Sequence, residues 1–562
     1  MAVSYGRLFV GGVLLATLSC AHAQAADLER QAFKAPPLVV WNWTGLYAGA
    51  HAGATFGAAD ISSPYGPSIF GDQIRTPGLL LGGQVGYNWQ PAGSPWVFGI
   101  EGELSWLDAD GSGNCFAPNG EFTSSTCTAR PQYTGTLTGR IGYALGPTGR
   151  TLLYGKGGAA FLHNRVDVTT NENFAETSAA THSSNTVWGW TVGAGIEQAL
   201  SPAWSLKLEY DYRRFADFTM ATPQTVTTAE DGTVTPVPAS STSIRQSTHT
   251  VKLGLNYRFG ADANAAWGPG EQAMAAVTPT GDWNFEIGGR YWYSSGRFQK
   301  DVPSEHKTST VLASRLTYAN VTGHSGEIFA RLDTPWLVFV KGFAGLGRIT
   351  DGHMNDEDWA VKNPDTNLSG AYSNTFSNLV ATNMNYQTID IGLNLLSGPG
   401  YKVGPLVGYN RVYERYASSD CVQFATTASG ICGPNVGYGP LITETDTWQS
   451  LRLGLAGDVW VTPRWRISAD IAWLPYVSFT GQDNHWRQSL VAQESGTGRG
   501  VQMEAIVSYF VTPQFSVGVG ARYWSMWTTA GSDIYDGTLT DRSDTYRYER
   551  FGGLFQASYK FN

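Results

Sequence analysis

The chain has 562 residues, with 67 glycines, 13% aromatic residues and only 15% charged residues. Its formal net charge of -9 gives no basic surface for a phosphate backbone, which excludes a nucleic-acid-binding protein. Beyond residue 25 no stretch approaches the roughly 18 uninterrupted apolar residues of a membrane-spanning helix, which excludes a helical membrane protein.

The N-terminus has the three zones of a secretory signal. Arg7 precedes the apolar run 8–18, and small residues follow up to Ala23 and Ala25. We therefore predict a signal peptide over residues 1–25 and export of the mature chain.

The remaining chain consists of segments of about ten residues in which apolar and polar side chains alternate. In 204–212 and in 465–473 one face is apolar and aromatic, and the other is polar. A soluble β-sandwich also alternates, but it does not require aromatic residues at both ends of so many strands. The pattern is typical of an outer-membrane β-barrel, whose strands face lipid on one side and a polar interior on the other.

In the first half, short turns alternate with long polar loops, as periplasmic turns and external loops do in such barrels. The short turns are at 91–95, 146–149 and 201–203, and the long loops are near 58–76, 109–131, 169–185 and 219–246. This spacing predicts an eight-stranded barrel over residues 40–260. Residues 261–280 show no alternation and are predicted to be a periplasmic linker.

The second half has four short turns of its own, at 333–335, 398–400, 462–463 and 512–513. Four periplasmic turns require ten strands, which predicts a ten-stranded barrel over residues 281–562. The predicted fold class is therefore all-β, with two transmembrane antiparallel β-barrels in tandem. We expect such a chain in the bacterial outer membrane, inserted by the barrel-assembly machinery.

Four cysteines remain after the signal peptide, in two close pairs. Cys115 with Cys127, and Cys421 with Cys432, each lie in a predicted loop rich in Gly, Asn and Ser. In an exported chain we predict two local disulfides. A metal site built from these thiols is disfavoured, because no histidine lies at a suitable spacing.

Strand parity places two polar stretches at one rim of the second barrel. The third strand, about 337–350, and the seventh, about 464–480, both run upward; the third precedes Asp356 and Asp358, and the seventh precedes Asp483 and His485. A carboxylate two residues from a histidine can orient the ring and leave one nitrogen free as a base. A close carboxylate pair can position a water and retain a proton. These four residues predict hydrolysis by an activated water, without a metal or a covalent nucleophile.

Less specific interpretations of the same stretches remain open. An Asp-x-Asp sequence in an external loop is often solvated or binds calcium. A zinc site would need more imidazoles or thiolates than His353 and His485 supply.

The second half resembles the omptins, outer-membrane endopeptidases with a ten-stranded barrel and an Asp-Asp plus Asp-His site at the external mouth. The resemblance runs through Ser314–Tyr318, Gly352–Trp359, Val407–Tyr409, Asp483–His485 and Val511–Pro513. It implies an aspartic-type endopeptidase acting on polypeptides. Asp356 and Asp358 would be its acid pair, and Asp483 and His485 its dyad.

Two departures from the omptin pattern concern substrate preference and lipid binding. The family's preference for basic residues is attributed to two acids of the specificity pocket, and this chain has Gly481 and Lys300 at those positions. A preference for basic side chains is therefore not expected. The family also binds lipopolysaccharide through a Tyr-x-Glu-x-Arg strand, which here retains Tyr409 and places Arg411 beside it. These two residues are the expected lipopolysaccharide contacts, and no other cofactor is expected.

The first half resembles the small eight-stranded porin-like or surface-antigen barrels of α-proteobacteria, opening with Trp43–Gly49 and closing with Tyr257–Phe259. It contains no catalytic constellation, and structural, adhesive and platform roles remain open for it. For the whole chain the leading hypothesis is an outer-membrane endopeptidase whose active site faces the outside. The alternative is a non-enzymatic surface barrel, an adhesin or an envelope-structural protein. A diffusion porin is weaker, because eight or ten strands enclose no roomy pore.

Overall fold

The structure is a computed structural model that describes residues 41–561 with internal gaps. The gaps are 69–70, 117–123, 147, 172–179, 229–232, 261–282, 304–310, 363–368, 399, 425–431, 433–439, 488, 536–537 and 540–542. The predicted signal peptide and linker lie outside the described residues. Every regular element within them is a β-strand, so the all-β prediction is confirmed. None of these elements is a helix long and apolar enough to cross a membrane.

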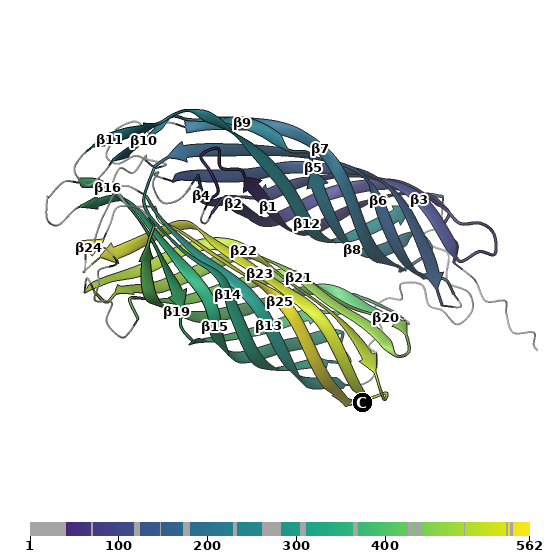
Figure 1. The fold of residues 1–562 in the computed structure, drawn as a ribbon. Coiled ribbons are helices and arrows are strands. Elements are labelled where there is room, and N and C mark those ends of the chain that lie inside the picture. Colours follow the sequence, from purple (N-terminus) through teal and green to yellow (C-terminus); the bar gives the residue numbers. More distant parts are fainter. Residues whose placement is uncertain are drawn as a thin grey trace, which may run out of the picture. The chain divides into compact units, whose positions relative to one another are not determined.

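The first sheet is a closed antiparallel barrel (Figure 1). Its long strands pair in chain order, and the last pairs with the first from Tyr47–Arg258 to Ile61–Ile244. They are β1 (Gly45–Ile61), β2 (Gln73–Trp89), β3 (Trp96–Ala109), β5 (Ser125–Leu145), β6 (Thr151–Thr170), β7 (Ala180–Ala199), β8 (Trp204–Phe215) and β12 (Ser240–Arg258).

Short strands extend this barrel at one end. β4 (Gly111–Cys115) pairs with β5 beyond the end of β3, and β9 (Phe218–Thr222) pairs with β12 beyond the end of β8. With them the sheet contains ten strands. β10 (Thr225–Thr228) and β11 (Val234–Val237) form a separate hairpin.

The second sheet closes in the same way, because β25 pairs with β13 (Figure 1). Its long strands are β13 (Asn284–Pro303), β14 (Leu312–Asp333), β15 (Val338–Lys362), β17 (Thr382–Leu393), β19 (Tyr401–Gln423), β20 (Ile442–Thr462), β21 (Trp465–His485), β22 (Leu490–Phe510), β23 (Phe515–Tyr535) and β25 (Thr545–Phe561). β16 (Ser369–Leu379) and β17 share one place between β15 and β19. β18 (Leu396–Gly398) and β24 (Thr538–Leu539) complete the thirteen strands.

Apolar side chains face outward and polar side chains face inward along these strands. On β21, Trp465 is 45% exposed and Trp473 is 41% exposed, whereas Arg466 between them is buried. On β8 the buried face carries Ser205, Lys207, Glu209 and Asp211. The predicted alternation is therefore confirmed, and both barrels have the outward apolar surface of membrane barrels.

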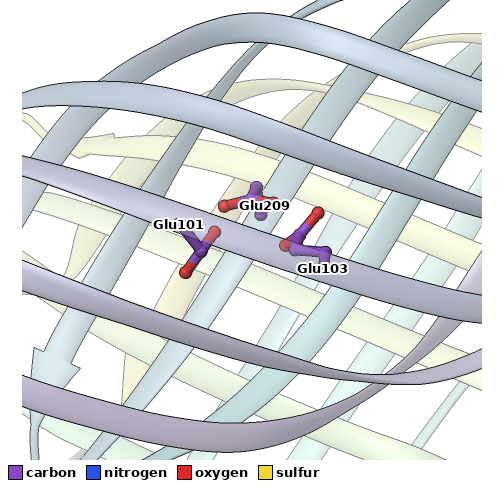
Figure 2. Close-up of side chains that lie close together, drawn as sticks. All are labelled: Glu101, Glu103 and Glu209. Atoms are coloured by element: carbon purple, nitrogen blue, oxygen red, sulfur yellow. The ribbon is translucent and has the colours of Figure 1, made fainter.

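Ion pairs fill the interior of the first barrel. Figure 2 shows Glu101, Glu103 and Glu209 close together inside it. Lys207 Nζ lies 2.9 Å from Glu101 Oε2 and 3.2 Å from Glu103 Oε1, and Lys252 Nζ lies 2.8 Å from Glu209 Oε1. Since each carboxylate has an ammonium partner, this cluster is a filled core and not an open cation site.

Several strands run farther than the turn pattern predicts. Cys115 lies on β4 and Cys127 on β5, so the first pair joins neighbouring strands and not two points of a loop. Both predicted disulfides, Cys115–Cys127 and Cys421–Cys432, are present. β15 and β21 likewise continue to Lys362 and His485, because neighbouring strands keep their backbone groups paired to those ends.

Candidate active site

The candidate site lies beyond the lipid-facing band of the second barrel. The run of exposed apolar side chains ends at Tyr293 on β13, Leu346 on β15 and Tyr476 on β21. Asp356 and Asp483 lie ten and seven residues farther along β15 and β21. At about 3.3 Å per residue, both are roughly 20 Å or more past the band along their strands. The site residues are therefore outside the membrane-spanning segments.

Both predicted pairs face the barrel interior. Side chains two residues apart share a face of a strand. Asp356 and Asp358 therefore share a face with Met354, and Asp483 and His485 share one with Phe479. Met354 and Phe479 belong to one buried interior cluster. The structure thus turns the two predicted pairs toward a common interior, on strands and not on loops.

One carboxylate oxygen of Asp483 contacts both His485 and Lys300. Nε2 of His485 lies 3.1 Å from Oδ2 of Asp483, and Lys300 Nζ of β13 donates to the same oxygen at 3.1 Å. Asp483 is 1% exposed, and the His485 side chain is 18% exposed. The acid is therefore buried, while the ring can be reached from solvent.

The charges of the dyad support each other. Burial acts to raise the pKa of Asp483, but the charges of Lys300 and His485 outweigh it and lower that pKa to about 2. Burial acts to lower the pKa of His485, but Asp483 outweighs it and raises that pKa to about 9. At neutral pH the free protein therefore holds an ionised Asp483 and a protonated His485.

The surroundings of the acid pair favour its protonated form. Burial and the neighbouring Asp358 raise the pKa of Asp356 well above its usual range. Burial also raises the pKa of Asp358, although a hydrogen bond from Ser314 opposes this. His485 lies close enough to lower both values. The two pairs therefore form one electrostatic unit.

Three further acids surround Gly481. Across the sheet, Gly481 pairs with Asp446 of β20 and Glu494 of β22, and Asp483 pairs with Glu444. A Cβ at position 481 would lie 2.8 Å from Glu494 Oε2 and 3.3 Å from Glu444 Oε1. The glycine therefore leaves the space that these carboxylates occupy. Burial raises the pKa of Glu444 and of Asp446 well above the usual range.

Sequence reasoning missed Glu444, Asp446 and Glu494. The strand register would have revealed them, because these acids lie on β20 and β22, the two strands that flank β21 with its Asp483 and His485. Lys300 and Gly481, the two predicted specificity positions, do lie at the site. Lys300 forms an ion pair with Glu494 as well as with Asp483.

The two predicted lipid contacts lie on the outer face of β19. Tyr409 is 38% exposed and donates a hydrogen bond to Gln449 Oε1 at 2.8 Å. Arg411 donates to Asn385 Oδ1 at 3.1 Å. Asn410 between them is fully buried. Tyr409 and Arg411 are therefore directed away from the interior site.

Two different families match the first and the second part of the chain. Residues 12–259 match the family described as outer membrane protein beta-barrel domain, and residues 314–553 match the omptin family. Over 256 residues the chain is 31% identical to the 31 kDa outer-membrane immunogenic protein of Brucella melitensis, covering 44% of this chain and 97% of that protein.

Two further proteins are similar to parts of the chain. The 22 kDa outer membrane protein of Rhizobium leguminosarum is 29% identical over 215 residues, covering 37% of this chain and 84% of that protein. The crystal structure of the outer membrane protease OmpT from Escherichia coli aligns with a TM-score of 0.40 at 15% identity, covering 51% of this chain and 100% of that one.

Proposed function

Since the chain is an outer-membrane protein that joins a β-barrel domain of the outer membrane protein family to an omptin-family barrel, we propose that the second barrel is an endopeptidase. Omptins are a protease family, which supports peptide hydrolysis as the reaction class. The observation that carries the proposal is the 3.1 Å contact between His485 and Asp483, with Asp356 and Asp358 facing the same interior. The substrates are exposed polypeptides, and the site faces the outside of the cell.

In the proposed reaction a water attacks the scissile carbonyl. Asp483 holds the imidazole of His485, and the neutral ring takes the proton of the water. Asp356 and Asp358 position that water, and the proton retained by the pair is available to the leaving amine. No enzyme nucleophile is needed, so the reaction is of the aspartic type.

Lys300 and the acids near Gly481 are the proposed specificity elements. Lys300 already supplies a cation to Asp483 and Glu494, so a basic substrate side chain is not required there. A neutral or acidic residue beside the scissile bond is the expected preference.

Lipopolysaccharide is the proposed activating lipid. Tyr409 and Arg411 lie on the outward face of β19, and Arg415 of the same strand is exposed. Two guanidinium groups on one outward stripe suit the phosphates of such a lipid. Insertion by the barrel-assembly machinery belongs to the same proposal.

The test is cleavage of a peptide library by refolded protein with lipopolysaccharide. We expect His485→Ala and Asp356→Ala to lose about a hundredfold or more in kcat/KM, as removal of a general base does. His353→Ala is the matched control, because this histidine lies on the opposite face of β15 and stacks on Phe376. Equal activity in all four proteins would contradict the assignment, and absence of any turnover would favour the non-enzymatic surface barrel.

A further inference from the structure

Three carboxylates beside the dyad of Asp483 and His485 lie close together inside the second barrel. Oxygens of Glu444, Asp446 and Glu494 lie within 4.8 Å of one another, and all three side chains are buried. The acids come from β20 and β22, the two strands that flank the dyad strand. Their positions are therefore fixed by backbone pairing on both sides.

Two of these carboxylates receive no hydrogen bond from outside the cluster in the part of the chain that the structure describes. Glu444 and Asp446 are both 0% exposed, and among the described residues no donor outside the cluster reaches an oxygen of either side chain. A buried carboxylate without a donor is costly, because nothing replaces the water that it has lost. The oxygens are thus placed for a ligand that brings positive charge.

The first barrel shows how this chain neutralises such a cluster with its own residues. Its three glutamates, shown in Figure 2, are paired with three buried lysines, Lys156, Lys207 and Lys252. Among the described residues of the second barrel, Lys300 is the one lysine or arginine that forms an ion pair with the corresponding cluster, and it is shared with Asp483. The second cluster therefore has fewer internal cations than carboxylates.

Formal charges give the size of the deficit. When all four are ionised, Glu444, Asp446, Glu494 and Asp483 carry four negative charges, against one positive charge each on Lys300 and a protonated His485. A divalent cation makes the group neutral. Three oxygen ligands without nitrogen or sulfur suit a hard ion such as Ca²⁺.

We propose that Glu444, Asp446 and Glu494 bind a divalent cation of the Ca²⁺ class beneath the dyad. The rival occupant is a cationic side chain of a peptide. The close convergence of the three carboxylates favours a compact ion over a planar guanidinium, which needs room for its five donors. Binding of the ion does not depend on peptide hydrolysis.

The test uses refolded full-length protein and Tb³⁺ as the luminescent probe for a Ca²⁺ site. Trp448 is fully buried two residues from Asp446 on the same face of β20, so it can sensitise a bound lanthanide. We expect saturable sensitised emission that Ca²⁺ displaces. The double variant Glu444→Gln, Asp446→Asn should weaken binding at least tenfold, and it relieves charge repulsion, so it should fold.

Two controls separate the outcomes. Asp351→Asn removes an exposed acid of β15 outside the cluster and should leave the titration unchanged. Trp448→Phe should abolish the emission while calorimetry still detects Ca²⁺. Equal binding by wild type and double variant, or no saturable binding by wild type, would overturn the site. Displacement of Tb³⁺ by an arginine peptide but not by Ca²⁺ would assign the cluster to a substrate side chain instead.

Discussion

His485 is a base only after it loses the proton that Asp483 stabilises. Because its pKa is about 9, the neutral ring is the minor form at neutral pH and becomes the major form above that value. We therefore expect kcat/KM for a cleaved peptide to rise with pH up to about 9 and then level off. Replacing Asp483 with Asn should move this rise to lower pH and reduce the plateau. A flat profile from neutral to alkaline pH would exclude His485 as the base.

The neighbouring carboxylates limit the room for a side chain at position 481. Gly481→Ala should push Glu494 away from Lys300 and destabilise the barrel by about 1–3 kcal/mol, as overpacking does. Thermal unfolding of the refolded protein measures this change. Gly553→Ala is the matched control, since a Cβ there meets no atom within 4 Å. Equal stability of the two variants would show that the cluster has room for a side chain at position 481.

For single residues, the sequence predicts which side chains form the site better than it predicts which side chains lie around them. Asp483 and His485 are found from spacing alone, because a carboxylate two residues from a histidine can orient its ring. Glu444 and Glu494 are not, because their proximity depends on the register of two other strands. In the sequence Lys300 is seen as a departure from the acid of the omptin pattern. Its 3.1 Å contact with Asp483 in the structure shows that it interacts with the dyad.

Strand β19 carries the proposed lipid contacts, so its outer face can be tested separately from the site. Arg411→Ala should raise the lipopolysaccharide concentration needed for half-maximal activity about tenfold, because one charge-assisted pair with phosphate is lost. Activity at saturating lipid should change little, since Arg411 does not face the interior. Arg464→Ala, at a turn on the opposite end of the barrel, is the control. An unchanged lipid titration would remove β19 from the lipid site.

Strand ends are the part of each element that composition does not determine. Alternation identifies β8 and β21, and proline and glycine mark their short turns. The far ends of β15 and β21 are polar enough to look like loops, yet cross-strand pairing continues through Asp356 and Asp483. The polar character there reflects a polar barrel interior and not a break in the strand.

Each barrel closes through its own first and last strands, β1 with β12 and β13 with β25. We therefore expect residues 281–562 to refold without the first half and to keep peptidase activity within about threefold, because the site uses no strand of the first half. Heat-modifiable migration and peptide cleavage measure these two properties. Failure of this fragment to fold, while the full chain does, would make the first barrel a folding partner.

The two halves differ in how much of their interior is predictable from sequence. Tandem barrels follow from turn spacing and alternation, which repeat often enough to be recognised. The lysine-glutamate network of the first barrel depends on which inward residues meet across the lumen, and that depends on strand stagger. Catalytic residue types in the sequence therefore indicate the site of the second half but do not reveal the ion-pair network of the first.

β21 extends beyond the lipid-facing band. This extension sets the minimum height above the membrane at which a substrate anchored in the same membrane can be cleaved. Seven residues past Tyr476 correspond to a height of about 18 Å for a strand tilted by roughly 40°. An extended tether advances at most about 3.5 Å per residue. A neighbouring protein would thus need a stalk of at least about five residues before any bond in it could arrive at the dyad, and shorter stalks would be protected by geometry alone.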